Sequence, residues 1–177
     1  MYKEALEIYR RLSHSNPQAY EPDVAGKLNN LANLYSDTQR FTEGEAMYKE
    51  VLEILRRLAH STPQAYEPDM AQTLNNLAAL YANTQRFTEG EAMYKEALEI
   101  YRRLAHSNPQ AYEPDVAMTN CNLGLLYKEQ GKYAEAIPRF EETLDIYRRI
   151  AQVNPAQQQW YEKSSYWLNQ LKRLIEK

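Results

Sequence analysis

Hydrophobic side chains along the chain recur with a helical period. Between residues 28 and 35 the apolar positions fall at i, i+3, i+4, i+6 and i+7, which places them on one stripe of a helix. A second stripe runs from Phe41 to Leu58, and only the polar residues 37–40 separate the two. A connection this short is typical of antiparallel neighbours. The pattern therefore predicts a pair of packed antiparallel helices.

Prolines predict where one helix pair ends and the next begins. The second helix is expected to stop before Pro63, because a proline disfavours helical geometry at the residue before it. A connection over residues 64–69 then leads into the next first helix, with Pro68 suited to the first helical position. The sequence has no alternating β-branched runs and no Asn-Gly turns, which are the usual signals of strands. The predicted fold class is all-α.

The helix pair is one unit of a repeat of 46 residues. The segment that begins at Met1 recurs at Met47 and Met93, and 36 of 46 positions are identical between residues 1–46 and 47–92. A period of this length indicates a solenoid or an array.

The repeat predicts a single domain over residues 1–177, an α-solenoid with about seven helices. Its expected parts are a lone second helix with its loop, three full pairs, and a more polar first helix that caps the stack. These parts span residues 1–21, 22–67, 68–113, 114–155 and 156–177.

The repeats resemble the tetratricopeptide repeat. That family pairs two helices through a sparse pattern of large and small residues, here Leu31, Ala32, Tyr35, Phe41, Gly44, Tyr48 and Leu52. The family's usual period is about 34 residues, and the longer unit here is most similar to the kinesin-light-chain subgroup. The resemblance implies a right-handed superhelix whose first helices line the concave side. It also implies a non-enzymatic scaffold that binds a protein or peptide. Since that subgroup often carries a proline at the place of Pro138, we expect a mild kink there without a break.

The outward positions of the first helices are the candidate binding site. Asparagine is a mediocre helix former, yet it recurs one repeat apart at Asn30, Asn76 and Asn122. An amide offers two donors and an acceptor, enough to grip the peptide bonds of an extended segment, and the resembling subgroup uses this column in that way. Alternatively, the asparagines bond to neighbouring helices and hold the stack together. The predicted peptide-binding residues are Asn29, Asn30, Asn33, Asn75, Asn76, Asn122 and Leu125.

Other uses of the fold are disfavoured. Chaperone-binding members of the family clamp a terminal carboxylate with lysine and arginine on the concave face. The matching positions here carry no cation: Asn29, Asn33, Asn76, Met118 and Asn122. Tyr20, Tyr66 and Tyr112 could form a ridge for a partner, but the favoured interpretation is that they fold back over the seam between repeats.

Composition and charge change this picture little. A formal net charge of −3 over 177 residues gives no reason to expect nucleic acid or an anionic membrane as the partner. No stretch is apolar enough to span a membrane, and no signal peptide is visible. The single Cys121 favours a reducing compartment such as the cytoplasm. His14, His60 and His106 end second helices, where an imidazole can meet exposed carbonyls. No metal, cofactor or catalytic arrangement is predicted, so we expect no enzyme activity.

Two functions from different classes follow. The first is an adaptor that holds a peptide segment in its concave groove and is a monomer in solution. The alternative is self-assembly, as a swapped dimer or a head-to-tail oligomer, through the unpaired terminal helices.

Overall fold

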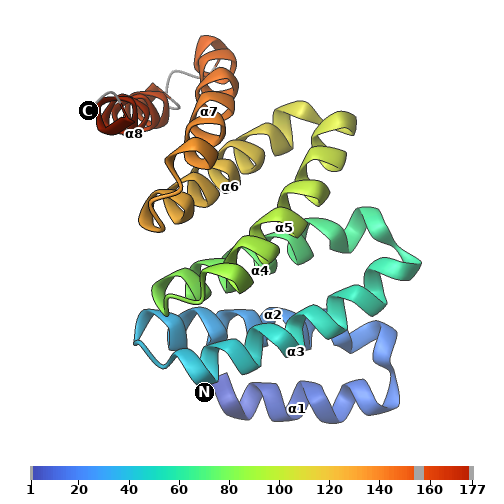
Figure 1. The fold of residues 1–177 in the computed structure, drawn as a ribbon. Coiled ribbons are helices and arrows are strands. Elements are labelled where there is room, and N and C mark those ends of the chain that lie inside the picture. The colour runs from blue at the N-terminus through green and yellow to red at the C-terminus, as the bar shows by residue number, and fades with distance from the viewer. Residues whose placement is uncertain (1, 154–157, 176–177) are drawn as a thin grey trace. The chain divides into compact units, whose positions relative to one another are not determined.

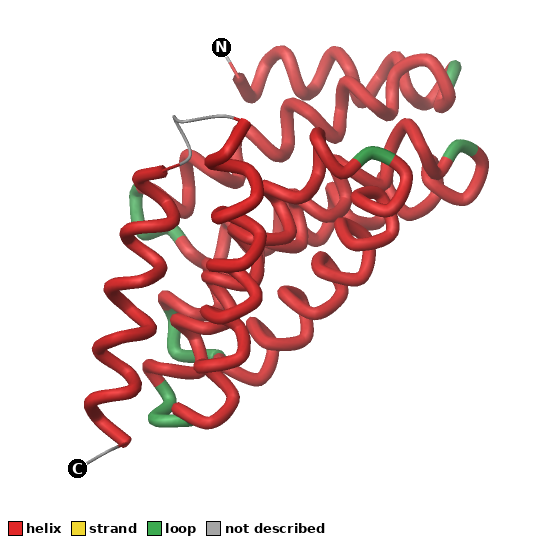
Figure 2. The backbone as a smooth tube through the Cα atoms, turned by 90° about the horizontal axis from the view of Figure 1, so that it is seen from above, coloured by secondary structure: helices red, strands yellow, loops and turns green. Residues whose placement is uncertain are grey.

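The computed structural model describes residues 2–153 and 158–175, which form helices joined by short turns (Figure 1; Figure 2). Each of the six helices α2–α7 has 21 residues, so the 46-residue period appears as two equal helices and two turns. The described residues contain no strand, which confirms the all-α class. The helices are α1 (Tyr2–Ser15), α2 (Pro17–Asp37), α3 (Phe41–Ser61), α4 (Pro63–Asn83), α5 (Phe87–Ser107), α6 (Pro109–Glu129), α7 (Tyr133–Val153) and α8 (Gln158–Ile175).

The described residues form eight helices, one more than the predicted seven. A lone helix, three pairs and a final lone helix already make eight segments, and each of these segments is helical in the structure. The total predicted from the sequence was therefore a miscount. Pro155 and the predicted boundary between residues 155 and 156 lie outside the described residues.

The helices divide into two compact parts. The N-terminal part, Met1–Gln85, contains α1–α4, and the C-terminal part, Arg86–Lys177, contains α5–α8. In the N-terminal part α1 packs on α2, α2 on α3 and α3 on α4, and α2 also touches α4. In the C-terminal part α5 packs on α6, α6 on α7 and α7 on α8. The two first helices α2 and α4 are therefore neighbours, and α3 packs against both.

The first helices are longer than predicted, because the segment expected to be a connection is helical. α4 begins at Pro63, and Pro68 lies inside the helix instead of at its first position. Proline's fixed φ suits Pro63 at the start of the helix. Pro68 removes one backbone hydrogen bond, but it does so close to the helix start. Pro138 likewise lies within an uninterrupted α7, which confirms that the helix does not break there.

Small residues bring the helices of the N-terminal part close together, as the sequence predicted. A Cβ at Gly44 of α3 would lie 3.3 Å from the backbone oxygen of Ala32 in α2 and 3.2 Å from Leu80 Cδ1 in α4. Ala32 itself is fully buried. The core beside this contact contains Val24, Ala25, Leu28, Leu31, Tyr35, Val51, Ile54, Leu55 and Leu58.

The C-terminal part uses the same packing with one change in the core. Gly124 of α6 faces the fully buried ring of Phe140 in α7, and a Cβ at Gly124 would lie 2.9 Å from that ring. Leu171 of α8 is also fully buried. Asn120 of α6 is 0% exposed, although the matching positions of the two earlier repeats are buried leucines, Leu28 and Leu74.

Candidate functional site

A pocket of about 180 Å³ opens in the N-terminal part, between the first helices α2 and α4 with α3 as its floor. The helices α2 and α4 are the first helices of successive repeats, and Gly26 and Gln72, which are one repeat apart, both line the pocket. The lining combines apolar side chains with amides and one carboxylate. It consists of Pro22, Ala25, Gly26, Asn29 and Asn30 from α2, Val51 and Leu55 from α3, and Tyr66, Asp69, Gln72 and Thr73 from α4.

Two of the predicted peptide-binding residues, Asn29 and Asn30, lie together at this pocket. Asn29 is half-buried, and its Oδ1 atom is shielded from solvent without a hydrogen-bond partner in the described residues. Asn30 is exposed. A buried acceptor without a donor is costly, so Asn29 gains from any ligand that brings an N–H group.

Two further predicted residues, Asn33 and Asn76, bond to each other. Asn76 Nδ2 donates to Asn33 Oδ1 over 3.3 Å, and the Tyr48 hydroxyl donates to the same oxygen over 2.6 Å. Burial, with a smaller contribution from the charge of Asp37, raises the pKa of Tyr48 to about 12. The hydroxyl therefore stays protonated at neutral pH. These bonds join α2, α3 and α4, which fits the alternative interpretation that asparagines hold the stack together.

The remaining predicted residues lie in different surroundings. Asn75 is only 7% exposed. Asn122 and Leu125 are half-buried on α6 in the C-terminal part, where Met118 is 41% exposed on the same helix. The ammonium group of Lys128 lies 4.1 Å from the centre of the Trp167 ring of α8. The first-helix face of the C-terminal part is thus more apolar and aromatic than the pocket of the N-terminal part.

Cys121 has the properties of a packed thiol. Burial raises its pKa, while a hydrogen bond with Ser164 and the nearby charge of Lys163 oppose that shift. The thiolate is the nucleophilic form of cysteine, so a raised pKa makes this side chain less reactive. Within the described residues, no group of three or more His, Cys, Asp or Glu side chains could hold a metal ion. His14, His60 and His106 lie in the last turns of α1, α3 and α5, where the sequence placed them.

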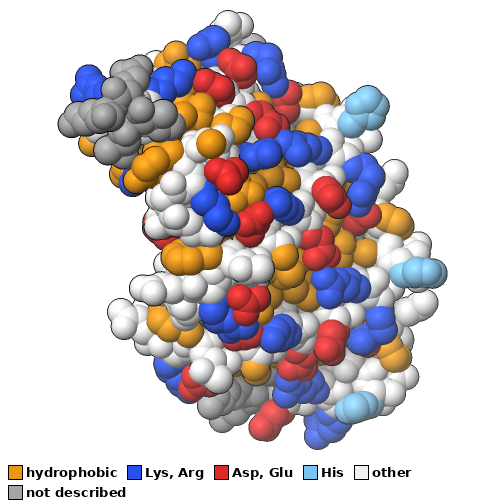
Figure 3. Space-filling view, in the orientation of Figure 1, with side chains coloured by type: hydrophobic (Ala, Val, Ile, Leu, Met, Phe, Trp, Pro, Cys, Tyr) orange, Lys and Arg blue, Asp and Glu red, His pale blue; other side chains and the backbone are white. Residues whose placement is uncertain are grey.

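Ion pairs between second helices recur with the repeat. In the N-terminal part Arg10 pairs with Glu50 over 2.6 Å, joining α1 to α3. In the C-terminal part the matching Arg102 pairs with Glu142 over 2.7 Å, joining α5 to α7. Basic and acidic side chains alternate over the face shown in Figure 3. The residues are exposed in part, so each pair contributes at most about 1 kcal/mol, and their main effect is to fix which helix faces which.

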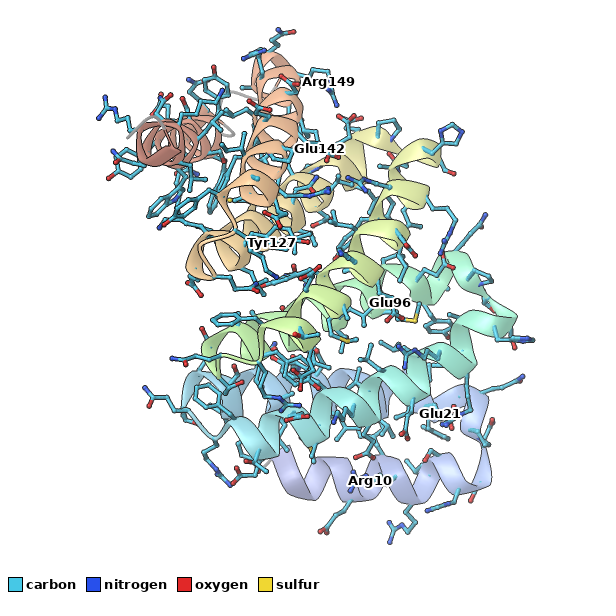
Figure 4. The ribbon with its side chains drawn as sticks, viewed as in Figure 1. Arg10, Glu21, Glu96, Tyr127, Glu142 and Arg149 are labelled. Carbon is cyan, nitrogen blue, oxygen red and sulfur yellow. The ribbon has the colours of Figure 1, made fainter. Side chains whose placement is uncertain are left out.

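A second set of contacts joins first helices to the preceding second helices. The Tyr127 hydroxyl, labelled in Figure 4, donates to Glu91 over 3.0 Å. Tyr81 donates to the matching Glu45 over the same distance. Sequence reasoning missed these bonds between helices, because the spacing of their partners depends on how the repeats stack.

The pocket residues Tyr66, Asp69 and Gln72 were not predicted as a group. Tyr66 and Asp69 fall in the segment expected to be a connection, and the extra helical turns of α4 bring them to the pocket wall. Tyr66 packs in part against the hydrophobic core, as the favoured interpretation of the loop tyrosines expects. A signal did exist in the sequence, since residues 66, 69 and 72–73 have the spacing of one helix face.

Packed helix pairs that recur along the chain define the class of helical-repeat scaffolds. Two family models of the tetratricopeptide repeat match the chain, one over residues 24–59 and the other over residues 69–149. Together the matches span more than half of the chain. The chain belongs to the tetratricopeptide-repeat family, a non-enzymatic fold for protein–protein interaction.

Solved structures share the fold. BtubC (BKLC) from P. vanneervenii matches with a TM-score of 0.58 and 18% sequence identity, covering 99% of this chain and 88% of that chain. The N-terminal domain of stress-induced protein-1 (STI-1) from C. elegans matches with a TM-score of 0.57 and 19% identity, covering 82% of this chain and 97% of that chain. No curated protein matches the chain. Among the described helices, none is both long and apolar enough to cross a membrane.

Proposed function

We propose that this scaffold is an adaptor that grips an extended peptide segment along its first helices, through main-chain hydrogen bonds to asparagine amides. The observation that carries the proposal is the pair Asn29 and Asn30 at an open pocket. One of these residues has a shielded oxygen without a donor, and the other is exposed to solvent. An amide can accept from a peptide N–H and donate to a peptide C=O, so such a site binds backbone without selecting particular side chains.

The other predicted residues contribute in different ways. Asn76 continues the column of Asn30 within the N-terminal part, and Asn122 has the same place in the repeat of the C-terminal part; both side chains are half-buried and within reach of solvent. Asn33 supports the column, because its oxygen already accepts two hydrogen bonds. Asn75 is buried and belongs to the packing. Leu125 offers an apolar contact on α6.

We further propose that residues 1–177 act as one repeat domain of the kinesin-light-chain-like type. The 46-residue unit and the shared fold of BtubC (BKLC) support the assignment to this subgroup. The near-neutral charge of the chain fits a protein or peptide partner better than nucleic acid.

The test uses a seven-residue random peptide library displayed on phage and selected against the whole chain. Peptides that bind are synthesised, and their affinities are measured by titration calorimetry for the parent chain and for Asn30→Ala. This residue is the sharpest probe, because it is exposed and alanine is the better helix former. Loss of binding in this variant therefore reports a lost contact, with the fold intact.

We expect Asn30→Ala to weaken binding about tenfold, which is the loss of one to two good hydrogen bonds. Glu53→Ala is the matched control, since Glu53 is an exposed helical residue of α3 outside the pocket. It should leave the affinity unchanged. Equal affinities for Asn30→Ala and the parent chain would remove the asparagine column from the binding site.

Self-assembly is the second candidate. It is favoured by large apolar side chains exposed on the first and last described helices, with Ile8 of α1 50% exposed and Tyr166 of α8 57% exposed. Such side chains could pack against a second copy. Light scattering across a concentration series tests the idea. A mass that rises with concentration in the parent chain, and not in an Ile8→Glu variant, supports it, and a constant monomer mass excludes it.

A further inference from the structure

The pocket between α2 and α4 has the size of one amino-acid side chain. Its volume of about 180 Å³ lies below the roughly 300–1,000 Å³ of small-molecule and cofactor sites. Val51 and Leu55 form an apolar floor, and the polar groups Asn29, Asn30 and Asp69 stand at the wall. A ligand that fits must therefore have an apolar body and a polar end.

Asp69 is the only charged residue of the pocket lining. Its carboxylate has no cation and no hydrogen-bond donor within the described residues. Acidic residues elsewhere in the N-terminal part do have basic partners, such as Glu21 with Arg57 over 2.7 Å and Glu50 with Arg10. Although Asp69 as a residue is exposed, burial of its carboxyl group raises its pKa. The pocket therefore contains a negative charge that the protein itself does not neutralise.

Gly26 keeps the pocket open. It lies in the interior of α2, where glycine costs about 0.5–1 kcal/mol relative to alanine. No packing contact explains this cost, because a Cβ at Gly26 would meet no atom within 4 Å. The matching residues of the next two repeats, Gln72 and Met118, have long side chains. The free space above Gly26 is thus a particular feature of this pocket.

We propose that the pocket binds a lysine or arginine side chain of the gripped segment. The aliphatic stem lies along Val51 and Leu55, and the cationic head meets the Asp69 carboxylate and donates to the oxygen of Asn29. Tyr66, also in the lining, presents an aromatic ring, which attracts cations. The inference rests on the proposed function and adds its specificity: the asparagines hold any backbone, and this pocket selects a basic residue.

Competing occupants fit less well. An acidic side chain would face the Asp69 carboxylate at close range, which is repulsive. An apolar side chain would fill the floor but would further desolvate Asp69 without supplying a counter-charge. Only a long cationic side chain can pack on the apolar floor of Val51 and Leu55 and also neutralise the Asp69 carboxylate at the wall.

The test starts from the same peptide selection on the whole chain. We expect one position of the selected peptides to be rich in lysine or arginine. Replacing that residue by norleucine keeps the stem and removes the charge, and it should weaken binding to the parent chain about tenfold. Asp69→Asn should weaken binding of the basic peptide by a similar factor, and it should not weaken binding of the norleucine peptide, which gains from the loss of a desolvated carboxylate. Asp23→Asn is the matched control, since Asp23 is the same residue one repeat earlier and does not line the pocket.

Two further variants test the pocket independently of Asp69→Asn. Gln72→Glu adds a second carboxylate at an exposed lining position and should tighten the basic peptide several-fold. Gly26→Met introduces the side chain that the third repeat carries and should block the pocket. A different outcome is that the selected peptides bind through Asn30 yet show no preference for a basic residue and bind equally to Asp69→Asn. That result overturns the pocket assignment alone. Peptides that bind without Asn30 and without Asp69 overturn the proposed function as well.

Discussion

Leu28, Leu74 and Asn120 occupy the same place in the first helices of successive repeats, and all three are 0% exposed. Both amide atoms of Asn120 lack a hydrogen-bond partner in the described residues, and so does the Oγ1 atom of the adjacent Thr119. A buried polar group without a partner costs about 1–3 kcal/mol. At the scale of residues, this is the least favourable position in the core.

Asn120→Leu should therefore raise the free energy of unfolding by about 1–3 kcal/mol. Leucine has the same number of side-chain heavy atoms as asparagine and the same branching at Cγ, and it already fits the same place in the two earlier repeats. Urea denaturation of the whole chain measures the change. Asn30→Leu, at an exposed position, is the control and should change stability by less than about 0.5 kcal/mol. A destabilised Asn120→Leu would show that the amide makes a bond that leucine cannot replace.

Asp69 provides a prediction about pH. Burial raises the pKa of Asp69 in the folded chain, so the folded state binds the proton more tightly than the unfolded state does. Stability then falls as pH rises from the ordinary aspartate value of about 3.9 through the raised value. Asp69→Asn has no charge to desolvate, so its melting temperature should exceed that of the parent chain at pH 7. The two temperatures should converge below about pH 3, because both side chains are then neutral. A difference that persists there would not come from ionisation.

At the scale of elements, glycine decides how closely two helices pack. Gly124 lets α6 approach the ring of Phe140 in α7, and Gly26 meets nothing. Gly124→Ala should destabilise the chain by about 1–3 kcal/mol, because its Cβ would lie 2.9 Å from a fully buried ring. Gly26→Ala should stabilise it by about 0.5–1 kcal/mol, because the new methyl enters open space and alanine favours the helix. Chemical denaturation measures the change in the free energy of unfolding for each variant, and the two changes should have opposite signs. Changes of the same sign would contradict the packing described for Gly124 and Gly26.

The helix pairs could be predicted from the sequence, whereas the pocket could not. The apolar stripes and the small pair of Ala32 and Gly44 depend on spacing along the chain, which the sequence shows directly. The sequence predicts a helix start at Pro68 and so places Asp69 in a connection, but a proline one turn further in is tolerated when Pro63 already begins the helix. The pocket also needs side chains from α2, α3 and α4 at once, and their meeting depends on tertiary packing.

The bonds of Asn33 illustrate the same limit. The sequence places the asparagines on one helix face, but it does not show which of them are already bonded. The Oδ1 atom of Asn33 accepts hydrogen bonds from Tyr48 and Asn76, whereas the side chain of Asn30 is exposed. Side chains of the same type in one face thus differ in how much they can offer a ligand.

At the scale of the whole molecule, a stack of repeats is stabilised mainly by contacts between neighbours. Local unfolding should therefore be most frequent in the repeat whose core is packed least favourably. The amides of α6, next to the unpaired Asn120 and Thr119, should exchange with deuterium faster than those of α2 and α4, which have leucine at the matching place. Asn120→Leu should slow exchange in α6. Equal protection in all three helices of the parent chain would mean that the polar core does not weaken its repeat.

The ion pairs between second helices have a consequence for how such a chain can change length in evolution. Arg10 with Glu50 and Arg102 with Glu142 use the same two places of the repeat. If residues 47–92 were deleted, Arg10 would meet Glu96, which occupies the place of Glu50. Tyr127 would likewise meet Glu45 in place of Glu91. Both of these severed contacts have an identical substitute, so recombination between copies of the gene segment can remove or add a repeat and still leave these polar side chains matched at the junction.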